Sequence, residues 1–277
     1  MMTIRAACVQ MRSTTEVAPN IAAAAELIRD AAAQGATFIA TPEMTNLLDI
    51  RPGQARSKIA LEADDACLKA LSRLAKDLSV TLLIGSLAVA LPDERRYANR
   101  SYLIGPDGSV LSSYDKIHMF DVEVGDGQSY RESRAYRAGQ TAALVKTPFG
   151  QIGLTICYDV RFPHLYRQLG QAGADIVTIP AAFTQVTGAA HWHVLVRARA
   201  IETGSFILAP AQGGRHDDGR ETFGHSLIVS PWGEILAEAA GQAPGFILAD
   251  LDLQDVTKAR ARIPALHNDQ VISLNRA

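Results

Sequence analysis

Apolar runs of strand length recur along the chain, and they are joined in two different ways. Residues 3–10 predict a strand, residues 19–34 an alanine-rich amphipathic helix, and residues 37–41 a second strand. Further along, two strand segments flank Gly105-Pro106-Asp107-Gly108, a sequence that predicts a hairpin. Helical connections favour parallel pairing and hairpins give antiparallel pairing, so the chain should form mixed sheets.

The same mixture of connections continues through the second half of the chain. The expected helices there are 161–169 and 189–202, and the expected strands are 144–147, 152–156, 174–180, 205–211, 226–230, 235–239 and 245–251. We therefore expect an α/β fold, a four-layer α-β-β-α sandwich of two mixed sheets with helices outside. No linker is visible, so residues 1–277 should form a single domain. Residues 254–277 show little apolar periodicity, which predicts a tail packed on a surface or on a partner subunit.

The composition is typical of a globular protein and excludes several classes of partner. Of the 277 residues, 48% are hydrophobic and 20% are charged, and the net charge is -2. Because basic and acidic residues are mixed along the chain, nothing indicates binding to nucleic acid or to a membrane, and we expect a small-molecule substrate. No apolar run is long enough to span a membrane and the start lacks signal-peptide features, so the expected location is cytoplasmic.

The cysteines are Cys8, Cys67 and Cys157, an odd number at distant positions. They lack the CxxC spacing of a zinc or redox site, so we expect free thiols and no metal or cofactor. Cys8 falls within a buried strand. Cys67 shares a face with Leu71 and Leu74 of a helix expected at 64–78, which places it in a core or an interface.

Cys157 differs because it follows an apolar strand and precedes a helix. At such a turn, free backbone N–H groups and the positive helix end favour a thiolate and a developing oxyanion, which makes Cys157 a candidate nucleophile. The alternative is a buried, inert cysteine of the core.

Glu43 and Lys116 also follow predicted strands, so they could meet Cys157 at one sheet edge. A glutamate can take the thiol proton, a lysine can stabilise an oxyanion, and a cysteine can carry an acyl group. These residue types suffice for amide or nitrile hydrolysis. For Glu43, the alternative is an ordinary solvated glutamate. A long polar loop at 122–139, which carries Glu132, is more often functional than passive.

Three segments, TPEM around Glu43, YDKIHMFD around Lys116 and GLTICYDVRFP around Cys157, resemble the signature motifs of the nitrilase superfamily of carbon-nitrogen hydrolases. The likeness continues in AACVQM, YANRSYLIGPDG, GHSLIVSPWGEILAE and GFILADLD. The resemblance implies a Glu43-Lys116-Cys157 triad on the same four-layer sandwich. It further implies that Glu132 hydrogen-bonds the lysine or positions the substrate, and that the backbone N–H of Tyr158 is a second oxyanion donor.

Within the superfamily, the segments around residues 118–139 and 187–233 are most similar to deaminated glutathione amidases and the related ω-amidases. This resemblance implies hydrolysis of the terminal primary amide of a small keto-acid amide, to acid and ammonia, through a thioester. Alternatives are an ω-amidase acting on α-ketoglutaramate, an N-carbamoyl amino acid amidohydrolase, a nitrilase, or an inactive binding protein on the amidase fold. Because the family is usually oligomeric, the resemblance also implies a homodimer or a higher homo-oligomer.

Some polar residues admit more than one interpretation. Arg161 is a candidate anchor for a substrate carboxylate, although it could equally be structural. Arg197 and Arg199 lie near the predicted core and could pair in a dimer interface. His193 stands where members of the compared branch carry glutamate, and His191 and His193 should point to different faces of their helix, which disfavours a metal pair.

Two further interpretations concern histidines. A cysteine peptidase would need His118 or His164 as the base for Cys157, but the glutamates at the other motif positions argue against that mechanism. The polar segment His216-Asp217-Asp218 is interpreted as a solvated loop.

Overall fold

Two six-stranded mixed sheets pack face to face in the computed structural model, which describes residues 3–51, 53–125 and 129–276. The first sheet has the order β16 (Gly245–Asp252), β1 (Thr3–Gln10), β2 (Phe38–Ala40), β3 (Thr81–Ala90), β4 (Tyr97–Ile104) and β5 (Val110–Asp115). The second has the order β15 (Ile235–Glu238), β14 (Leu227–Val229), β11 (Phe206–Ala209), β10 (Ile176–Thr178), β9 (Gly150–Leu154) and β8 (Ala143–Thr147).

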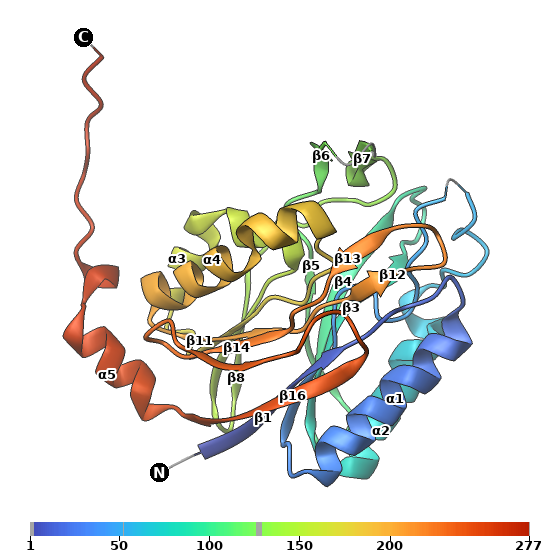
Figure 1. Cartoon of the computed structure of the whole chain (residues 1–277), viewed down its shortest axis with the longest axis horizontal. Helices are drawn as coiled ribbons and strands as arrows, with labels where there is room; N and C mark the ends of the chain where they lie inside the picture. The colour runs from blue at the N-terminus through green and yellow to red at the C-terminus, as the bar shows by residue number, and fades with distance from the viewer. Residues whose placement is uncertain (1–2, 52, 126–128, 277) are drawn as a thin grey trace.

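Helices cover the outer faces of both sheets, which completes the expected α-β-β-α sandwich (Figure 1). The first sheet carries α1 (Val17–Ala33) and α2 (Ala66–Leu78), and the second carries α3 (Pro163–Gln171) and α4 (Gln185–Thr203). Further elements are α5 (Gln254–Arg262), the ribbons β6 (Asp121–Glu123)–β7 (Ser129–Arg131) and β12 (Gly213–Arg215)–β13 (Glu221–Phe223), and the 3-10 turns η1 (Glu62–Asp64), η2 (Glu132–Arg134), η3 (Cys157–Arg161) and η4 (Ala265–His267). The fold class is therefore confirmed.

Strand β1 contributes side chains to two separate hydrophobic cores, one on each face of its sheet. Successive side chains of a strand point to opposite faces of its sheet. Ile4 and Cys8 accordingly join the core between the two sheets. Ala7 and Val9 face the other way and pack in the core that contains Ile28 of α1. Both faces of this strand are buried, which explains its nearly continuous apolar sequence.

The structure corrects several expectations about connections. The expected loop at 122–139 contains the β6–β7 ribbon, while its residues 126–128 lie outside the described residues. The β12–β13 ribbon was not predicted at all. Residues 254–262, expected to be part of an irregular tail, form the helix α5, because Val256 and Ala259 provide a small buried face.

The rest of the predicted tail divides into two parts. Leu266 is buried, and Asp269 is bonded to Arg167 and Gln171 of α3. Residues 268–276 have no regular structure, and beyond Asp269 they run away from the body of the protein (Figure 1). Val271, Ile272 and Leu274 are exposed. Packing on a partner subunit stays a prediction for this segment.

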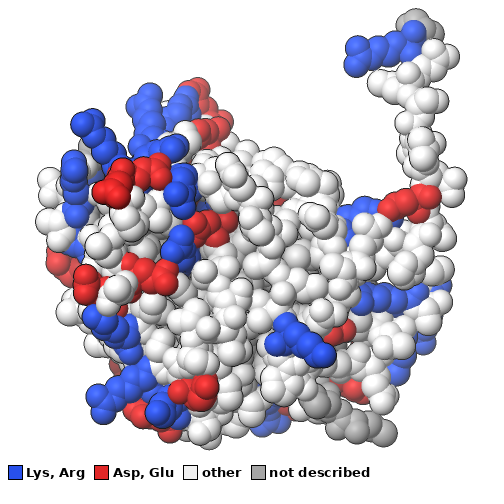
Figure 2. Space-filling view, turned by 180° about the vertical axis from the view of Figure 1, so that it is seen from behind, with Lys and Arg blue, Asp and Glu red and all other residues white. Residues whose placement is uncertain are grey.

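Charged side chains of both signs lie intermingled on the face drawn in Figure 2, as the mixed charge along the sequence predicted. Among the helices in the described ranges, none has the length and apolarity that a membrane crossing requires.

Candidate active site

The predicted convergence of Glu43, Lys116 and Cys157 is seen in the structure. Each residue comes at or shortly after the end of a strand, and these strands are β2, β5 and β9. Strands β2 and β5 belong to one sheet and β9 to the other, so the site forms where the two sheets meet at one end. All three side chains line one pocket of about 1020 Å³.

Glu43 is buried and held by donors on both of its carboxylate oxygens. Oε1 accepts hydrogen bonds from Lys116 Nζ at 2.9 Å and from Asn99 Nδ2 at 2.9 Å. Oε2 accepts from the backbone N–H of Ala182 at 2.9 Å. Burial alone would raise the pKa of Glu43, but the charge and hydrogen bond of Lys116 outweigh it and lower that pKa. Glu43 is thus an ionised base at neutral pH.

Glu132 also bonds the lysine, as the motif resemblance implied. Its carboxylate accepts from Lys116 Nζ at 2.9 and 3.1 Å, from Asn99 Nδ2 at 3.1 Å and from the backbone N–H of Phe120 at 2.7 Å. Burial lowers the pKa of Lys116, yet the charges of Glu132 and Glu43 more than compensate, and the pKa is raised well above its ordinary value. Lys116 therefore stays a cation.

Asn99 was missed as a site residue, although it lies in the quoted YANRSY segment. One amide nitrogen donates to both Glu43 and Glu132, while Oδ1 is buried without a hydrogen-bond partner among the described residues. Its position within the strand β4 is the signal that could have identified it, because asparagine is depleted in strands.

Cys157 begins η3 with a left-handed backbone, φ 48°, which is uncommon for a residue with a side chain. Its backbone N–H donates to the carbonyl of Pro180 at 2.9 Å. The buried carboxylate of Asp159 stabilises this turn, because it accepts hydrogen bonds from the backbone N–H of Ile156 at 2.9 Å and from the Tyr114 hydroxyl at 2.7 Å. These bonds fix the backbone at Cys157, whose side chain lines the pocket.

The environment of Cys157 differs from the one expected for a cysteine at a strand-to-helix turn. Burial raises the pKa of its thiol, the nearby charge of Glu43 raises it further, and Lys116 only partly offsets these effects. The prediction that the turn favours a resting thiolate is therefore wrong. The site instead pairs a neutral thiol with an ionised carboxylate that can take its proton.

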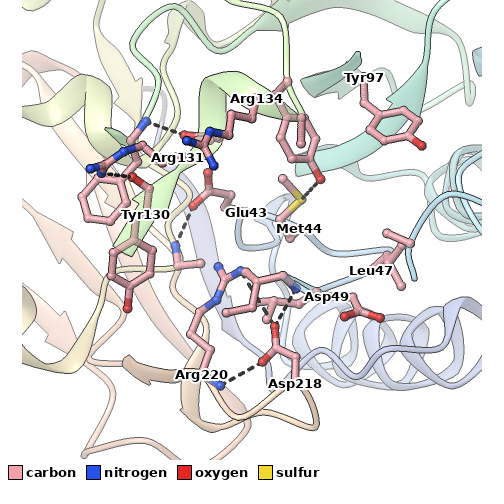
Figure 3. A pocket seen from close by; sticks show the side chains of 18 of the residues that line it. Glu43, Met44, Leu47, Asp49, Tyr97, Tyr130, Arg131, Arg134, Asp218 and Arg220 are labelled. Atoms are coloured by element: carbon pink, nitrogen blue, oxygen red, sulfur yellow. Dashed lines mark hydrogen bonds and ion pairs between the residues drawn. The ribbon is translucent and has the colours of Figure 1, made fainter. Parts of the chain in front are cut away.

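Several arginines line the pocket that contains Glu43, Lys116 and Cys157. Figure 3 shows Arg131 and Arg134 on one side of the cavity and Arg220 on the other. Arg220 is 3.8 Å from the Asp218 carboxylate, and its Nε is buried without a hydrogen-bond partner among the described residues. The remaining lining includes the aromatic residues Tyr97, Phe120, Tyr130, Tyr136, Tyr158 and Phe183.

Arg161, the predicted carboxylate anchor, is not among the described residues that line the pocket. Its guanidinium lies 5.3 Å from the centre of the Phe183 ring and 6.0 Å from that of Tyr158. One of its nitrogens is 3.3 Å from Nδ1 of His191. The structure thus gives Arg161 a packing position behind the pocket wall.

Arg197 and Arg199 both bind carbonyls of their own chain. Nε of Arg199 donates to Val160 O at 2.7 Å, which ties α4 to the turn that follows Cys157. Nε of Arg197 donates to Gly233 O at 2.8 Å. Pairing of these arginines across a dimer stays a prediction.

The two interpretations of histidines from the sequence have different outcomes. Nδ1 of His118 is 2.7 Å from Asp159, and neither His118 nor His164 is among the described pocket-lining residues, so the geometry does not support a cysteine peptidase. The interpretation of the segment from His216 to Asp218 as a solvated loop is wrong for His216 and Asp218, although Asp217 is exposed. His216 is buried between Ser13 O and the Thr222 hydroxyl, each at 2.8 Å, and Asp218 lines the pocket.

Comparison with known proteins decides the family. The model of the carbon-nitrogen hydrolase family matches residues 5–261. The chain belongs to the carbon-nitrogen hydrolase family. It is accordingly an amidase-type hydrolase that acts on carbon–nitrogen bonds other than peptide bonds, built on the nitrilase-superfamily fold.

Three relatives of this carbon-nitrogen hydrolase illustrate the range of similarity. The deaminated glutathione amidase of Synechocystis sp. is 41% identical over 266 residues, which cover 95% of this chain and 97% of that protein. The NitFhit protein of C. elegans superposes with a TM-score of 0.89 at 32% identity, over 97% of this chain and 65% of its own. A glutamate-to-glutamine mutant of the amidase from Nesterenkonia sp. AN1, 26% identical with a TM-score of 0.77 over 94% of this chain and 98% of its own, was solved after Michael addition of acrylamide at its active-site cysteine.

Proposed function

We propose that this carbon-nitrogen hydrolase is a cysteine-dependent amidase. In this proposal Cys157 is the nucleophile, Glu43 the general base and acid, and Lys116 an oxyanion donor. The observation that carries it is the buried cluster in which Lys116 Nζ bridges Glu43 and Glu132 on the wall of the pocket that Cys157 lines. The reaction of the Nesterenkonia amidase with acrylamide at its own active-site cysteine supports it by analogy.

Acylation begins from the neutral thiol. As the sulfur of Cys157 attacks the amide carbon, Glu43 takes the thiol proton and the carbonyl oxygen becomes an oxyanion. The Lys116 ammonium and the backbone N–H of Tyr158 stabilise that oxyanion. When the tetrahedral intermediate collapses, protonated Glu43 gives its proton to the leaving amine, and the acyl group remains on the sulfur as a thioester.

Deacylation repeats these steps with water. Glu43 removes a proton from the water as its oxygen attacks the thioester carbon, and the second oxyanion occupies the same site. Collapse breaks the carbon–sulfur bond, the sulfur recovers a proton from Glu43, and the free acid leaves. Glu132 acts through Lys116 as a positioning residue, because it holds the lysine in place and keeps it charged.

For the substrate, we propose a small keto-acid amide of the deaminated glutathione kind. The name of the Synechocystis relative supports this class, as do the arginines around the pocket, which can bind a carboxylate. The scissile amide of deaminated glutathione is secondary, so its cleavage would release cysteinylglycine as the amine. Of these two keto-acid amides, only α-ketoglutaramate, whose amide is primary, would release ammonia, so the expected release of ammonia from a terminal primary amide applies to that one alone. N-carbamoyl amino acids and nitriles would use the same three catalytic residues.

The substrate class can be tested by measuring acid and amine products from deaminated glutathione, α-ketoglutaramate, N-carbamoyl amino acids and simple nitriles. We expect the highest kcat/KM with a keto-acid amide. Arg220→Met should lower kcat/KM for keto-acid amides more than for an uncharged amide. Arg161→Met should affect both substrates equally. If only Arg161→Met lowered kcat/KM for the keto-acid amide more than for the uncharged amide, Arg161 and not Arg220 would bind the substrate carboxylate.

Catalysis can be tested separately from substrate choice with Cys157→Ala. This variant should fold normally but lose roughly 10⁴-fold or more in kcat. Cys67→Ala, a buried cysteine in α2, is the matched control and should keep wild-type kcat. An acyl group trapped on Cys157 and detected by mass spectrometry would exclude an inactive binding protein. Wild-type turnover by Cys157→Ala would overturn the proposed mechanism.

We also propose the cytoplasmic location that the sequence predicted and, from the family resemblance, a homo-oligomeric state. Analytical ultracentrifugation of the full chain would test the oligomeric state, and fractionation of the source cells would test the location.

A further inference from the structure

A second cluster of reactive side chains lies outside the catalytic pocket. His193 comes from α4, His225 from the segment before β14, and Glu238 from the end of β15. Nε2 of His193 is 2.9 Å and Nδ1 of His225 is 2.8 Å from the same oxygen of Glu238. One nitrogen from each histidine and one carboxylate oxygen all lie within 4.8 Å of one another.

His225 is held rigidly. Its backbone is left-handed, φ 53°, and its N–H donates to Gly241 O at 3.1 Å. Its carbonyl accepts from Trp192 Nε1 at 2.8 Å, and its ring stacks on Phe223 with centroids 4.4 Å apart. A non-glycine residue in this conformation is uncommon and persists only where its surroundings fix it.

The other two side chains are also oriented toward one point. The His193 ring meets Phe223 and His225 edge to face, with centroids 6.0 and 5.5 Å away. Within the described ranges, Glu238 forms its ion pairs with these two histidines and with no lysine or arginine.

We propose that His193, His225 and Glu238 bind one divalent transition-metal ion, with zinc as the best-matched ion. Two imidazoles and one carboxylate form a common zinc ligand set, and water can complete the coordination. In a tetrahedral zinc site the ligand atoms stand about 3.3 Å apart, as follows from metal–ligand distances of about 2.0–2.1 Å. The two nitrogen-to-oxygen distances, 2.9 and 2.8 Å, would therefore open by only about half an ångström around the ion. The two histidine nitrogens, which lie within 4.8 Å of each other, would adjust to the same spacing.

Solvent can reach the proposed site. The side chains of His193 and Glu238 are 33% and 35% exposed. An ion could therefore enter without unfolding the chain. When bound, it would connect α4 to the β14–β15 hairpin through three separate elements, which assigns it a structural role. Trp192, which precedes His193 in the same helix, packs on Phe183 at 4.9 Å between ring centroids, and Phe183 lines the pocket of the candidate active site.

The spacing argument against a metal pair at His191 and His193 agrees with this arrangement. His191 contacts Arg161, whereas His193 faces the β14–β15 hairpin. The metal ligands that complement His193 lie 32 and 45 residues further along the chain, as the positions of His225 and Glu238 show. A local search of the sequence could not find them.

The test uses the full chain without a histidine tag, freed of metal with a chelator and titrated with zinc by calorimetry. We expect one ion per chain. His193→Gln and Glu238→Gln should weaken binding by at least about 10–100-fold, the loss seen even for outer-shell partners of metal sites. Glutamine keeps a hydrogen-bonding side chain at each position, so both variants should fold. His191→Gln, two residues away on the same helix, is the matched control and should bind like wild type.

Zinc could instead bind Cys157 in the pocket, and two measurements separate the sites. Cys157→Ala should retain zinc binding with unchanged stoichiometry. Cobalt bound to the wild-type chain should show no thiolate-to-cobalt charge-transfer band, because the proposed ligands are nitrogen and oxygen. Zinc should also raise the Tm of wild type and of His191→Gln, but not that of His193→Gln. Binding that survives in both His193→Gln and Glu238→Gln, or that disappears in Cys157→Ala, would overturn the proposal.

Discussion

The Lys116 ammonium lies 2.9 Å from the Glu43 carboxylate, and the two side chains are only 2% and 5% exposed. In such a buried pair, removal of one charge leaves the other poorly compensated. We predict that Glu43→Gln lowers kcat by about 10²–10⁴-fold, the usual contribution of a general base. Steady-state kinetics on the preferred amide would measure the loss. A variant that kept wild-type kcat would remove Glu43 from the mechanism.

The same pair predicts a pH dependence of stability. Because the folded-state pKa of Glu43 is lowered, ionised Glu43 stabilises the fold at pH values above its unfolded pKa of about 4.3. That contribution is lost as the pH falls through the folded-state value. The difference in unfolding free energy between wild type and Glu43→Gln should therefore shrink below about pH 4.3. Urea unfolding of both chains across this range would test it, and a constant difference would contradict the sign.

The raised pKa of Cys157 predicts how the enzyme reacts with iodoacetamide. Burial and Glu43 keep the thiol protonated, so inactivation should continue to accelerate as the pH rises past the ordinary thiol value of about 8.5. Lys116→Gln removes the group that lowers this pKa and should slow alkylation further. Cys8 and Cys67 are fully buried and should not react in the folded chain. A plateau of the rate near neutral pH would indicate a resting thiolate instead.

Asn99 donates to Glu43 and Glu132 from one nitrogen, which makes it a positioning residue for both carboxylates. We predict that Asn99→Ala lowers kcat by about 10²-fold, as expected when catalytic groups shift by about 1 Å. Asn20→Ala is the control, because Asn20 is equally buried but bonds Thr14 and the carbonyl of Asn46. It should lose stability and keep kcat. Equal effects on kcat would assign Asn99 a purely structural role.

The sequence predicted what depends on local pattern. Strand β1 has the expected bounds, and Glu43, Lys116 and Cys157 were found because each follows a predicted strand. The bonds that orient them join distant residues: Tyr114 meets Asp159 across 45 positions. No local pattern encodes such contacts.

Burial explains the other failures of prediction. The thiolate expected at Cys157 is disfavoured because the turn is buried beside a carboxylate. The segment at His216 has a solvated composition, yet Ser13 O and the Thr222 hydroxyl satisfy the ring inside the protein. Whether a polar side chain finds such partners depends on the tertiary fold.

Gly85 tests whether the close packing of β3 against residues 41–42 fixes the position of Glu43. It lies where the β3–β4 register shifts, and a Cβ atom there would be 2.0 Å from Thr41 O and 2.5 Å from Pro42 O. A side chain would push away the two residues that precede Glu43. We predict that Gly85→Ala destabilises the fold by about 1–3 kcal/mol, as overpacking does, and lowers kcat.

Gly245→Ala is the matched control for this substitution. Gly245 begins β16, and apart from its two chain neighbours no described residue has an atom within 4 Å of the added Cβ. Stability should therefore change by no more than about 0.5 kcal/mol, and kcat should stay the same. Urea unfolding and steady-state kinetics on both variants separate the two effects. If Gly85→Ala lost stability but kept wild-type kcat, the backbone at 41–42 could move without displacing Glu43. The three hydrogen bonds that the Glu43 carboxylate accepts would then be sufficient to fix its position.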